Sequence, residues 1–435
     1  MFKRQIPISE DFVDRNKKRK RKDPMKSRNT SKNWALQSLI DDEDWDSVIA
    51  LLTPKDKHHE RQLFQNISGM TESPLFIIFG KKKELCVSSK ALCLRLIDIG
   101  GEQMVKRVWN RAPDESMVWT ALYYACYKQG EADDKAIWSD VIKKLLEVGG
   151  KELVLMSGSY GTALHALLSH GPSAETSKVV HLLLTVGGKT LTLIQDCCGR
   201  TALHNLCLTG GKYGPEIVHQ ILAIGGEKLA CMTAEDGLTA LHCVTSTLDQ
   251  FTARIVDLLL KFGGERLVMM KTHGVGWTIL HMLCSNITKS MNRRKVLYDI
   301  ICRLVDIGGD KLVLMHDEML MTALHHFCKK REKHCLKILN RLLKVGGEEL
   351  LSKIDGNGDT VLHIACKAGR HRKELIYQLL DVGREELLFM EQLDEPCFTA
   401  IEIEFSARDT VKEEIIDRFF EIGGDKAANL IERFE

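Results

Sequence analysis

The sequence of 435 residues contains no long hydrophobic run. Its longest apolar stretches, such as residues 75–79, are five or six residues long, whereas a membrane-spanning helix needs about 20. The first residues, Phe2-Lys3-Arg4-Gln5, are followed by polar sequence rather than by the apolar run of a signal peptide. We therefore expect an intracellular, soluble chain that does not bind membranes.

The short motifs of common enzymes are also missing. No Gly-Lys-Ser/Thr follows the glycine-rich piece Gly274-Val275-Gly276, so a phosphate-binding loop is not indicated. The sequence has neither a Gly-x-Ser-x-Gly nucleophile elbow nor the kinase signature set. We expect a chain without catalytic residues and without a cofactor.

None of the 14 cysteines belongs to a Cys-x-x-Cys pair. Two groups nevertheless combine cysteine with histidine: His325, His326, Cys328, His334 and Cys335, and Cys197, Cys198, His204 and Cys207. Neither has the spacing of a four-ligand zinc site. We therefore expect no metal, and mostly reduced thiols in an intracellular protein.

One short motif recurs many times along the sequence. Thr-x-Leu-His begins at Thr162, Thr201, Thr239, Thr278, Thr322 and Thr360, and weaker copies begin at Ser73, Thr120 and Thr399. Successive threonines from 120 to 399 are 38 to 44 residues apart. A second marker, Gly-Gly after an apolar segment, recurs in phase, with Gly383-Arg384 as its one variant. Two markers with one period indicate stacked copies of a single unit.

Each copy is predicted to fold as two helices. Threonine is a good N-cap because its hydroxyl can accept a hydrogen bond from a free backbone N–H one turn later. An apolar first helix follows, then a polar loop, then a second helix with apolar residues three and four positions apart, as in residues 255–260. Gly-Gly is expected to end that helix. Because neither helix can bury its apolar side alone, the predicted fold class is an all-α solenoid of stacked helix-turn-helix repeats.

Thr-x-Leu-His at the start of one helix and Leu-Leu-x-x-Gly at the end of the next resemble the ankyrin repeat. The resemblance implies that the motif histidines tie each repeat to its neighbour by hydrogen bonds. Two features depart from that family: the period exceeds its roughly 33 residues, and proline follows the capping position only at Pro74. The apolar run after each Gly-Gly, such as residues 265–270, is expected to form a short helical turn in place of an open β-hairpin.

Three regions are predicted from these patterns. Residues 1–32 are expected to be a disordered basic tail, because they carry 12 Lys and Arg but only 4 Asp and Glu. Residues 33–70 are expected to form an N-terminal helical cap, with two helices between Asn33 and Leu52, followed by a linker. Residues 71–435 are expected to contain about nine ankyrin-like repeats with a C-terminal cap.

The basic tail has the layout of a bipartite nuclear import signal. Its two clusters are Lys3 and Arg4, and Lys17, Lys18, Arg19, Lys20, Arg21 and Lys22. We expect an import receptor to bind them, which would place the protein in the nucleus, or in nucleus and cytoplasm both. Basic clusters also bind nucleic acid through phosphates, so a chromatin- or RNA-associated regulator is the alternative. A third interpretation is a solvated tail that nothing binds.

The resemblance implies a protein-binding scaffold whose partner, of unknown identity, lies along the concave face. In ankyrin-like folds the residue before each repeat threonine projects from the inter-repeat connection toward that face. Those residues here are Arg200, Leu238, Trp277, Met321 and Asp359, with Phe398 after them. Large apolar side chains at such positions indicate binding anchors. Alternatively, they pack on the apolar turn of their own chain, for example on Leu267 or Met315.

Overall fold

The computed structural model describes residues 45–53, 58, 62–63, 73–81, 87–110, 118–158, 160–287, 290–330, 336–368, 373–392, 397–406 and 412–432. The chain divides into two compact units, residues 1–71 and 72–435. Within the first unit, α2 (Trp45–Leu51) coincides with the second helix of the expected cap and buries Val48. The basic tail and the first helix of the expected cap lie outside the described residues.

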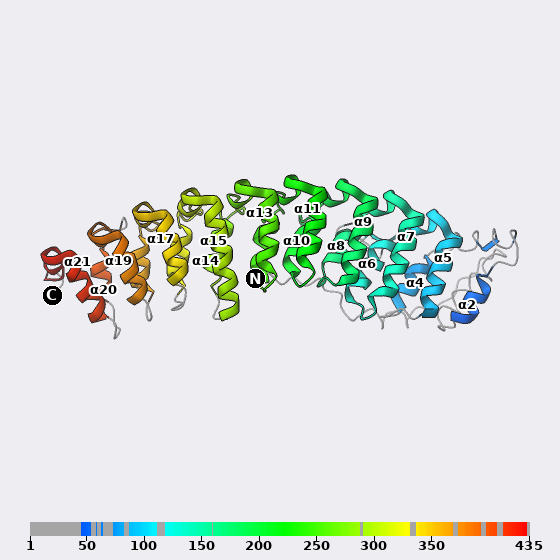
Figure 1. Ribbon diagram of the computed structural model, residues 1–435, viewed down its shortest axis with the longest axis horizontal. Coiled ribbons are helices and arrows are strands. Elements are labelled where there is room, and N and C mark those ends of the chain that lie inside the picture. Colours follow the sequence, from blue (N-terminus) through cyan, green and yellow to red (C-terminus); the bar gives the residue numbers. More distant parts are fainter. Residues whose placement is uncertain are drawn as a thin grey trace, which may run out of the picture. The chain divides into compact units, whose positions relative to one another are not determined.

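The described residues of the second unit form nine helix pairs, and the pairs follow one another in a single row (Figure 1). The short helices are α4 (Pro74–Lys81), α6 (Ala121–Glu131), α8 (Ala163–Leu168), α10 (Ala202–Thr209), α12 (Ala240–Cys243), α14 (Ile279–Ser285), α16 (Ala323–Lys329), α18 (Val361–Lys367) and α20 (Ala400–Phe405). The long helices are α5 (Val87–Val105), α7 (Lys135–Leu155), α9 (Ala174–Leu193), α11 (Gly214–Ala230), α13 (Thr252–Val268), α15 (Met291–Leu314), α17 (Leu336–Leu351), α19 (Lys373–Leu388) and α21 (Lys412–Glu432). A single turn of 3-10 helix, η3 (Val244–Ser246), extends α12.

The pairs form two layers. Each short helix packs against the short helix of the next pair, and each long helix packs against the next long helix. Leucines and isoleucines of both layers, such as Leu203, Ile221 and Leu241, are fully buried between them. The core is therefore continuous along the stack, and the predicted all-α solenoid of helix-turn-helix repeats is confirmed.

The repeat threonines begin the short helices as predicted. Thr120 is the N-cap of α6, and its hydroxyl accepts a hydrogen bond from the backbone N–H of Tyr123 at 3.0 Å. Thr399 caps α20 in the same way through the N–H of Glu402. These caps fix where each short helix starts, and hence where the chain enters each repeat.

The prediction that Gly-Gly ends a helix is confirmed, because the long helices each consist of two helical segments that meet at a kink at this pair. The second glycine adopts positive φ with ψ near −150°, as in Gly226 (φ 65°, ψ −158°), a region almost restricted to glycine. The first glycine leaves room for the leucine four residues later: a Cβ on Gly225 would lie 2.4 Å from Leu229 Cδ2. The residues after the bend are helical, so the expected helical turn is confirmed.

A short hairpin-like turn then connects this helical turn to the next threonine. Two such turns contain paired strands, β1 (Val108–Asn110) with β2 (Val118–Thr120) and β3 (Ser157–Gly158) with β4 (Gly161–Thr162). The later turns are closed by single bridges: Gln195 to Thr201, Thr233 to Thr239, His316 to Thr322, Ile354 to Thr360 and Glu391 to Thr399. The expanded connection therefore contains a helical turn and a hairpin in series.

The bend leads to a test of backbone strain. Arg384 occupies the second glycine position of its repeat with φ 45° and ψ −142°, where a side chain is strained. We expect Arg384→Gly to stabilise the protein by about 1 kcal/mol, after allowance for the greater freedom of glycine in the unfolded chain. Gly226→Ala should destabilise it by about 1 to 3 kcal/mol. Denaturant unfolding of both variants measures this, and a lower midpoint for Arg384→Gly would contradict it.

Candidate functional site

Buried histidines lie at the start of six short helices, α8, α10, α12, α14, α16 and α18, and most of them connect their repeat to the next. In His204, Nδ1 accepts a hydrogen bond from the backbone N–H of Thr201 at 3.1 Å, and Nε2 lies 3.1 Å from the carbonyl oxygen of Leu238 in the next repeat. Because Nδ1 is the acceptor, Nε2 must carry the proton and donate it to that carbonyl. We call this pair of bonds the histidine clamp.

The clamp recurs along the stack. Nε2 of His165 bonds the carbonyl of Arg200 at 3.0 Å, that of His281 bonds Met321 at 3.1 Å, and that of His363 bonds Phe398 at 3.1 Å. Each acceptor belongs to the residue immediately before the next repeat threonine. The structural role implied for the motif histidines is therefore confirmed at these four positions. In His242 and His325, Nδ1 accepts from the threonine N–H in the same way, but Nε2 has no hydrogen-bond partner among the described residues. In the last copy, Glu402 accepts from the N–H of Thr399 at 2.6 Å and supplies the first bond of the clamp only.

Burial keeps all six motif histidines neutral. It lowers the pKa of His204, His242, His281 and His325 to about 4, and it lowers the pKa of His165 and His363 as well. Hydrogen bonds to backbone carbonyls act in the opposite direction but are outweighed by the loss of hydration. A neutral ring is what the clamp requires, because a protonated Nδ1 could not accept from threonine.

The clamp carbonyls belong to the residues predicted to contact a partner, which the structure places as follows. Leu238, Met321 and Asp359 are buried, with exposed fractions of 7%, 6% and 5%, whereas Arg200 and Trp277 are half-buried. The burial of Leu238 and Met321 favours the alternative that they pack within their own chain. Partner contact by this set stays a prediction, with Arg200 and Trp277 the members that solvent reaches most.

Asp359 is held by polar groups of its own chain. Lys367 Nζ lies 2.7 Å from both carboxylate oxygens, and the side-chain amide of Gln392 donates to Oδ1. The Asp359 carboxylate is thus compensated within the protein. Phe398, the last of the residues that precede a repeat threonine, gives its carbonyl to His363.

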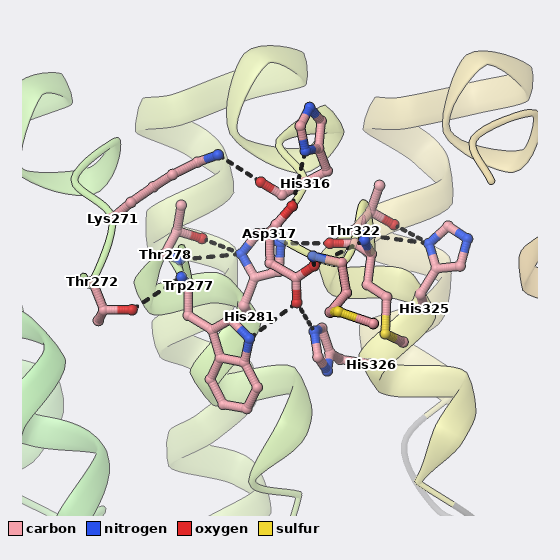
Figure 2. A network of polar contacts seen from close by, with 12 residues as sticks. Lys271, Thr272, Trp277, Thr278, His281, His316, Asp317, Thr322, His325 and His326 are labelled. Carbon is pink, nitrogen blue, oxygen red and sulfur yellow. Dashed lines mark hydrogen bonds and ion pairs between the residues drawn. The ribbon is translucent and has the colours of Figure 1, made fainter. Parts of the chain in front are cut away.

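Asp317 lies at the centre of the polar network in Figure 2. One of its oxygens accepts from the backbone N–H groups of Met319 and Met321, at 2.8 and 2.9 Å. The other accepts from Trp277 Nε1 at 3.0 Å and lies 2.8 Å from His326 Nε2. The network joins the turn before α14 to the turn before α16, and it fixes the indole of Trp277 in place.

The carboxylate of Asp317 is charged although only 3% of the residue is exposed. Burial raises its pKa, but the hydrogen bonds from His326, Met321 and Met319 outweigh burial and hold the pKa below its usual value. The His326 ring also packs edge-on against Trp277, with 4.8 Å between ring centroids. His326 belongs to one of the Cys and His groups described above, and in the structure it bonds Asp317 and packs on Trp277.

The sequence interpretation missed the aspartates that organise the turns. Asp196 Oδ1 accepts from the N–H groups of Cys198 and Arg200, both at 2.9 Å, and Asp355 Oδ1 accepts from Asn357 and Asp359 at 2.9 and 3.0 Å. With Asp317, these residues stand five positions before a repeat threonine. Aspartate that bonds the backbone two residues later is a common turn former, so this spacing was a usable signal.

Backbone hydrogen bonds join five turns into a continuous row. The N–H of Glu235 donates to Cys198 O at 3.0 Å, and that of His273 donates to Asp236 O at 2.9 Å. The N–H of Glu318 donates to Val275 O at 3.1 Å, and that of Gly356 donates to Met319 O at 2.7 Å. We call residues 196–200, 234–238, 273–277, 317–321 and 355–359 the turn row. Its backbone is ordered by the protein itself, which makes it the candidate binding surface.

The structure describes none of the residues of the predicted import signal and only some of those of the Cys and His groups. The import-signal residues Lys3, Arg4 and Lys17 to Lys22 lie outside the described residues, as do His334 and Cys335. Among the described residues, no group of three or more His, Cys, Asp or Glu side chains is arranged to hold a metal ion. No helix in the described part of the chain is long and apolar enough to cross a membrane.

Similarity to known proteins is found among solved structures. No protein-family model matches the chain, and no curated protein sequence matches it. Among solved structures, the ankyrin repeat domain of Bcl-3, a member of the IkappaB protein family, is 22% identical over 60% of this chain and 97% of that chain, with a TM-score of 0.42. The human ASB11 ankyrin repeat domain is 17% identical over 62% of this chain and 98% of that chain, also at 0.42.

A third structure is the Bd0816 predatory endopeptidase from Bdellovibrio bacteriovorus in complex with immunity protein Bd3460. It is 19% identical over 51% of this chain and 99% of the matched chain, with a TM-score of 0.37. The ankyrin-like fold of the present chain rests on its own geometry: threonine caps, histidine clamps and stacked helix pairs.

The buried histidines lead to a prediction of acid sensitivity. Their pKa rises from about 4 in the folded protein to about 6.5 in the unfolded chain, so the unfolded chain binds more protons between these values. The stability they contribute is complete above pH 6.5 and is lost as the pH falls toward 4. The loss at pH 5 should be on the order of 2 kcal/mol per histidine.

Denaturant unfolding between pH 7.5 and 5 measures this effect. His204→Gln should reduce the dependence on pH, because the amide can accept and donate in place of the ring but does not titrate. His219→Gln is the matched control, since His219 is exposed on α11 and should not alter the dependence. Equal midpoints at pH 7.5 and pH 5 would contradict the neutral clamp.

Proposed function

We propose that this chain is a non-catalytic scaffold that binds another protein along the turn row and the adjoining side of the short helices. One observation carries the proposal: the positions that build the repeat are alike, whereas the outermost position of each turn differs. Threonine and histidine recur at the clamp, but Cys198, Asp236, Val275, Met319 and Asn357 occupy the equivalent turn position in five successive repeats. The repeats thus share the threonine and histidine that stack them and differ in the turn residue that is exposed to solvent.

The rigidity of the row supports this function. Association loses free energy when loops must be ordered on binding. Here the turn backbones are already held by Asp196, Asp317 and Asp355 and by the bonds between neighbouring turns. A partner would therefore meet a preformed surface, to which Arg200 and Trp277 also contribute because they are half-buried.

Photo-cross-linking of the full-length chain tests this surface. A photoreactive residue at Asp236, which is exposed in the turn row, is compared with one at Lys261, which is exposed on long helix α13. In a nuclear extract we expect protein cross-links from position 236 and none of the same protein from position 261. Cross-links from position 261 alone, or no protein cross-links from position 236, would contradict the proposed binding surface.

We further propose that the basic tail directs the protein to the nucleus. Residues 1–32 carry a net charge of +8 and the remainder carries −6, so the tail is the one strongly basic part of the sequence. Import receptors bind extended basic segments, and two clusters separated by a polar spacer fit a two-part signal. Basic clusters are shared with nucleic-acid binding, so tail-mediated binding of chromatin or RNA is the second candidate function.

Localisation of the full-length chain fused to a large fluorescent protein tests the import proposal. We expect nuclear fluorescence that is lost when Lys17, Lys18, Arg19 and Lys20 are changed to alanine and weakened when Lys3 and Arg4 are changed. Cytoplasmic fluorescence of the unaltered fusion would contradict import. Binding of nucleic acid that disappears without residues 1–32 and falls steeply with rising salt would favour the second candidate function.

A further inference from the structure

Exposed apolar side chains gather at one place on the turn row. Among the described residues, eight large apolar side chains are exposed, and three of them lie on two neighbouring turns. Val275, Met319 and Leu320 have exposed fractions of 53%, 60% and 47%. The hydrogen bond from Glu318 N to Val275 O brings the two turns together. We call these three residues the apolar turn patch. Such grouping on a protein surface marks an interaction site.

Leu320 is also an unfavourable residue for the backbone that it adopts. Its φ is 56°, and the equivalent position of four other turns is occupied by Gly199, Gly237, Gly276 and Gly358, with φ between 68° and 77°. Glycine adopts positive φ without strain, whereas a leucine there costs about 1 to 2 kcal/mol. Glycine at position 320 would therefore remove both the strain and an exposed apolar side chain. Folding does not account for Leu320, which points to a role in binding.

The patch stands on a fixed base. Below it, Asp317 accepts from the backbone N–H groups of Met319 and Met321, and Trp277 Nε1 and His326 lie against the other oxygen of Asp317 (Figure 2). Lys271 Nζ adds a bond to the carbonyl of His316 at 2.6 Å. Because both turns are anchored to each other, little order has to be gained when a partner binds.

The charges around the patch indicate the chemistry of that partner. Glu318 is exposed on one of the two patch turns, and Glu235 and Asp236 are exposed on the turn before them. The segments 234–238, 273–277, 317–321 and 355–359 contain no lysine or arginine, and the nearby Lys271 bonds the carbonyl of His316. Phosphates of nucleic acids or anionic lipids would be repelled by this surface. A cationic partner would be attracted, and complementary charge speeds association and excludes other partners.

The backbone of the two turns limits how the partner is held. The N–H of Glu318 and the carbonyl of Met319 already bond neighbouring turns, so these groups cannot pair with an added β-strand. Recognition must use side chains. On the basis of the proposed scaffold function, we propose that the apolar turn patch binds a protein segment that presents apolar side chains next to lysine or arginine.

Selection from a displayed library of random dodecapeptides on the full-length chain tests this proposal. The selected peptides should combine Leu, Ile, Met or Phe with Lys or Arg. Leu320→Gly should weaken their binding by about tenfold or more, because one apolar contact is lost, while it raises the thermal midpoint by removing strain. Val275→Thr, which keeps the shape of valine, should also weaken binding.

Arg384→Gly is the matched control, since it relieves the same kind of backbone strain outside the turn row and should leave peptide binding unchanged. Acidic peptides, peptides whose binding is insensitive to Leu320→Gly and Val275→Thr, or no selected peptide would overturn the proposal. If protein cross-links from position 236 persist in that case, the scaffold function stands and only the patch is wrong. If those cross-links are absent as well, both fail.

Discussion

Neighbouring repeats are joined by one recurring interaction, a hydrogen bond from the Nε2–H of a buried histidine to a carbonyl oxygen of the next repeat, which His165, His204, His281 and His363 form. In His204 this bond spans to Leu238, while the opposite nitrogen caps the helix that carries it. One ring thereby fixes the start of a helix and the position of the following turn. Where it forms, the clamp acts together with the backbone hydrogen bonds between neighbouring turns, which make the turn row continuous.

The same arrangement allows the surface residues of a repeat to vary while its interior contacts stay the same. The carbonyl that the clamp uses belongs to the backbone, so any side chain can occupy that position. Arginine stands there at 200 and methionine at 321. The side chains at this position differ in burial: Met321 is buried, whereas Trp277 is half-buried with its indole N–H bonded to Asp317. The residue before each repeat threonine can thus be substituted while the backbone contacts between repeats are retained.

Much of this fold was predictable because its determinants are local and repeated. A threonine before an apolar run indicates an N-cap in every copy, and nine copies reduce the chance of a wrong period. The need for the first glycine of each Gly-Gly pair was not predictable in the same way, since a single glycine is enough to end a helix. What decides it is the leucine four residues on, such as Leu229, which folds back over the first glycine.

The candidate site was less accessible to sequence reasoning. Position relative to the threonine correctly identified Leu238 and Met321 as turn residues but could not show that they are buried, because burial depends on neighbouring repeats that are distant in sequence. The Asp317 network joins residues 40 positions apart through Trp277, a pairing that no local pattern encodes. The strain at Leu320 could have been suspected, since glycine occupies that position in four other turns.

The variable length of the repeats has a consequence for how such a chain can change. The period ranges from 38 to 44 residues, yet the clamp and the turn keep their spacing from the threonine, so extra residues fall between the clamps. Removing residues 201–238 would place Arg200 directly before Thr239 and leave each remaining histidine with a carbonyl from the following repeat. Whole repeats are therefore interchangeable units, and gene duplication or deletion could lengthen, shorten or reorder the turn row while the contacts between repeats are kept.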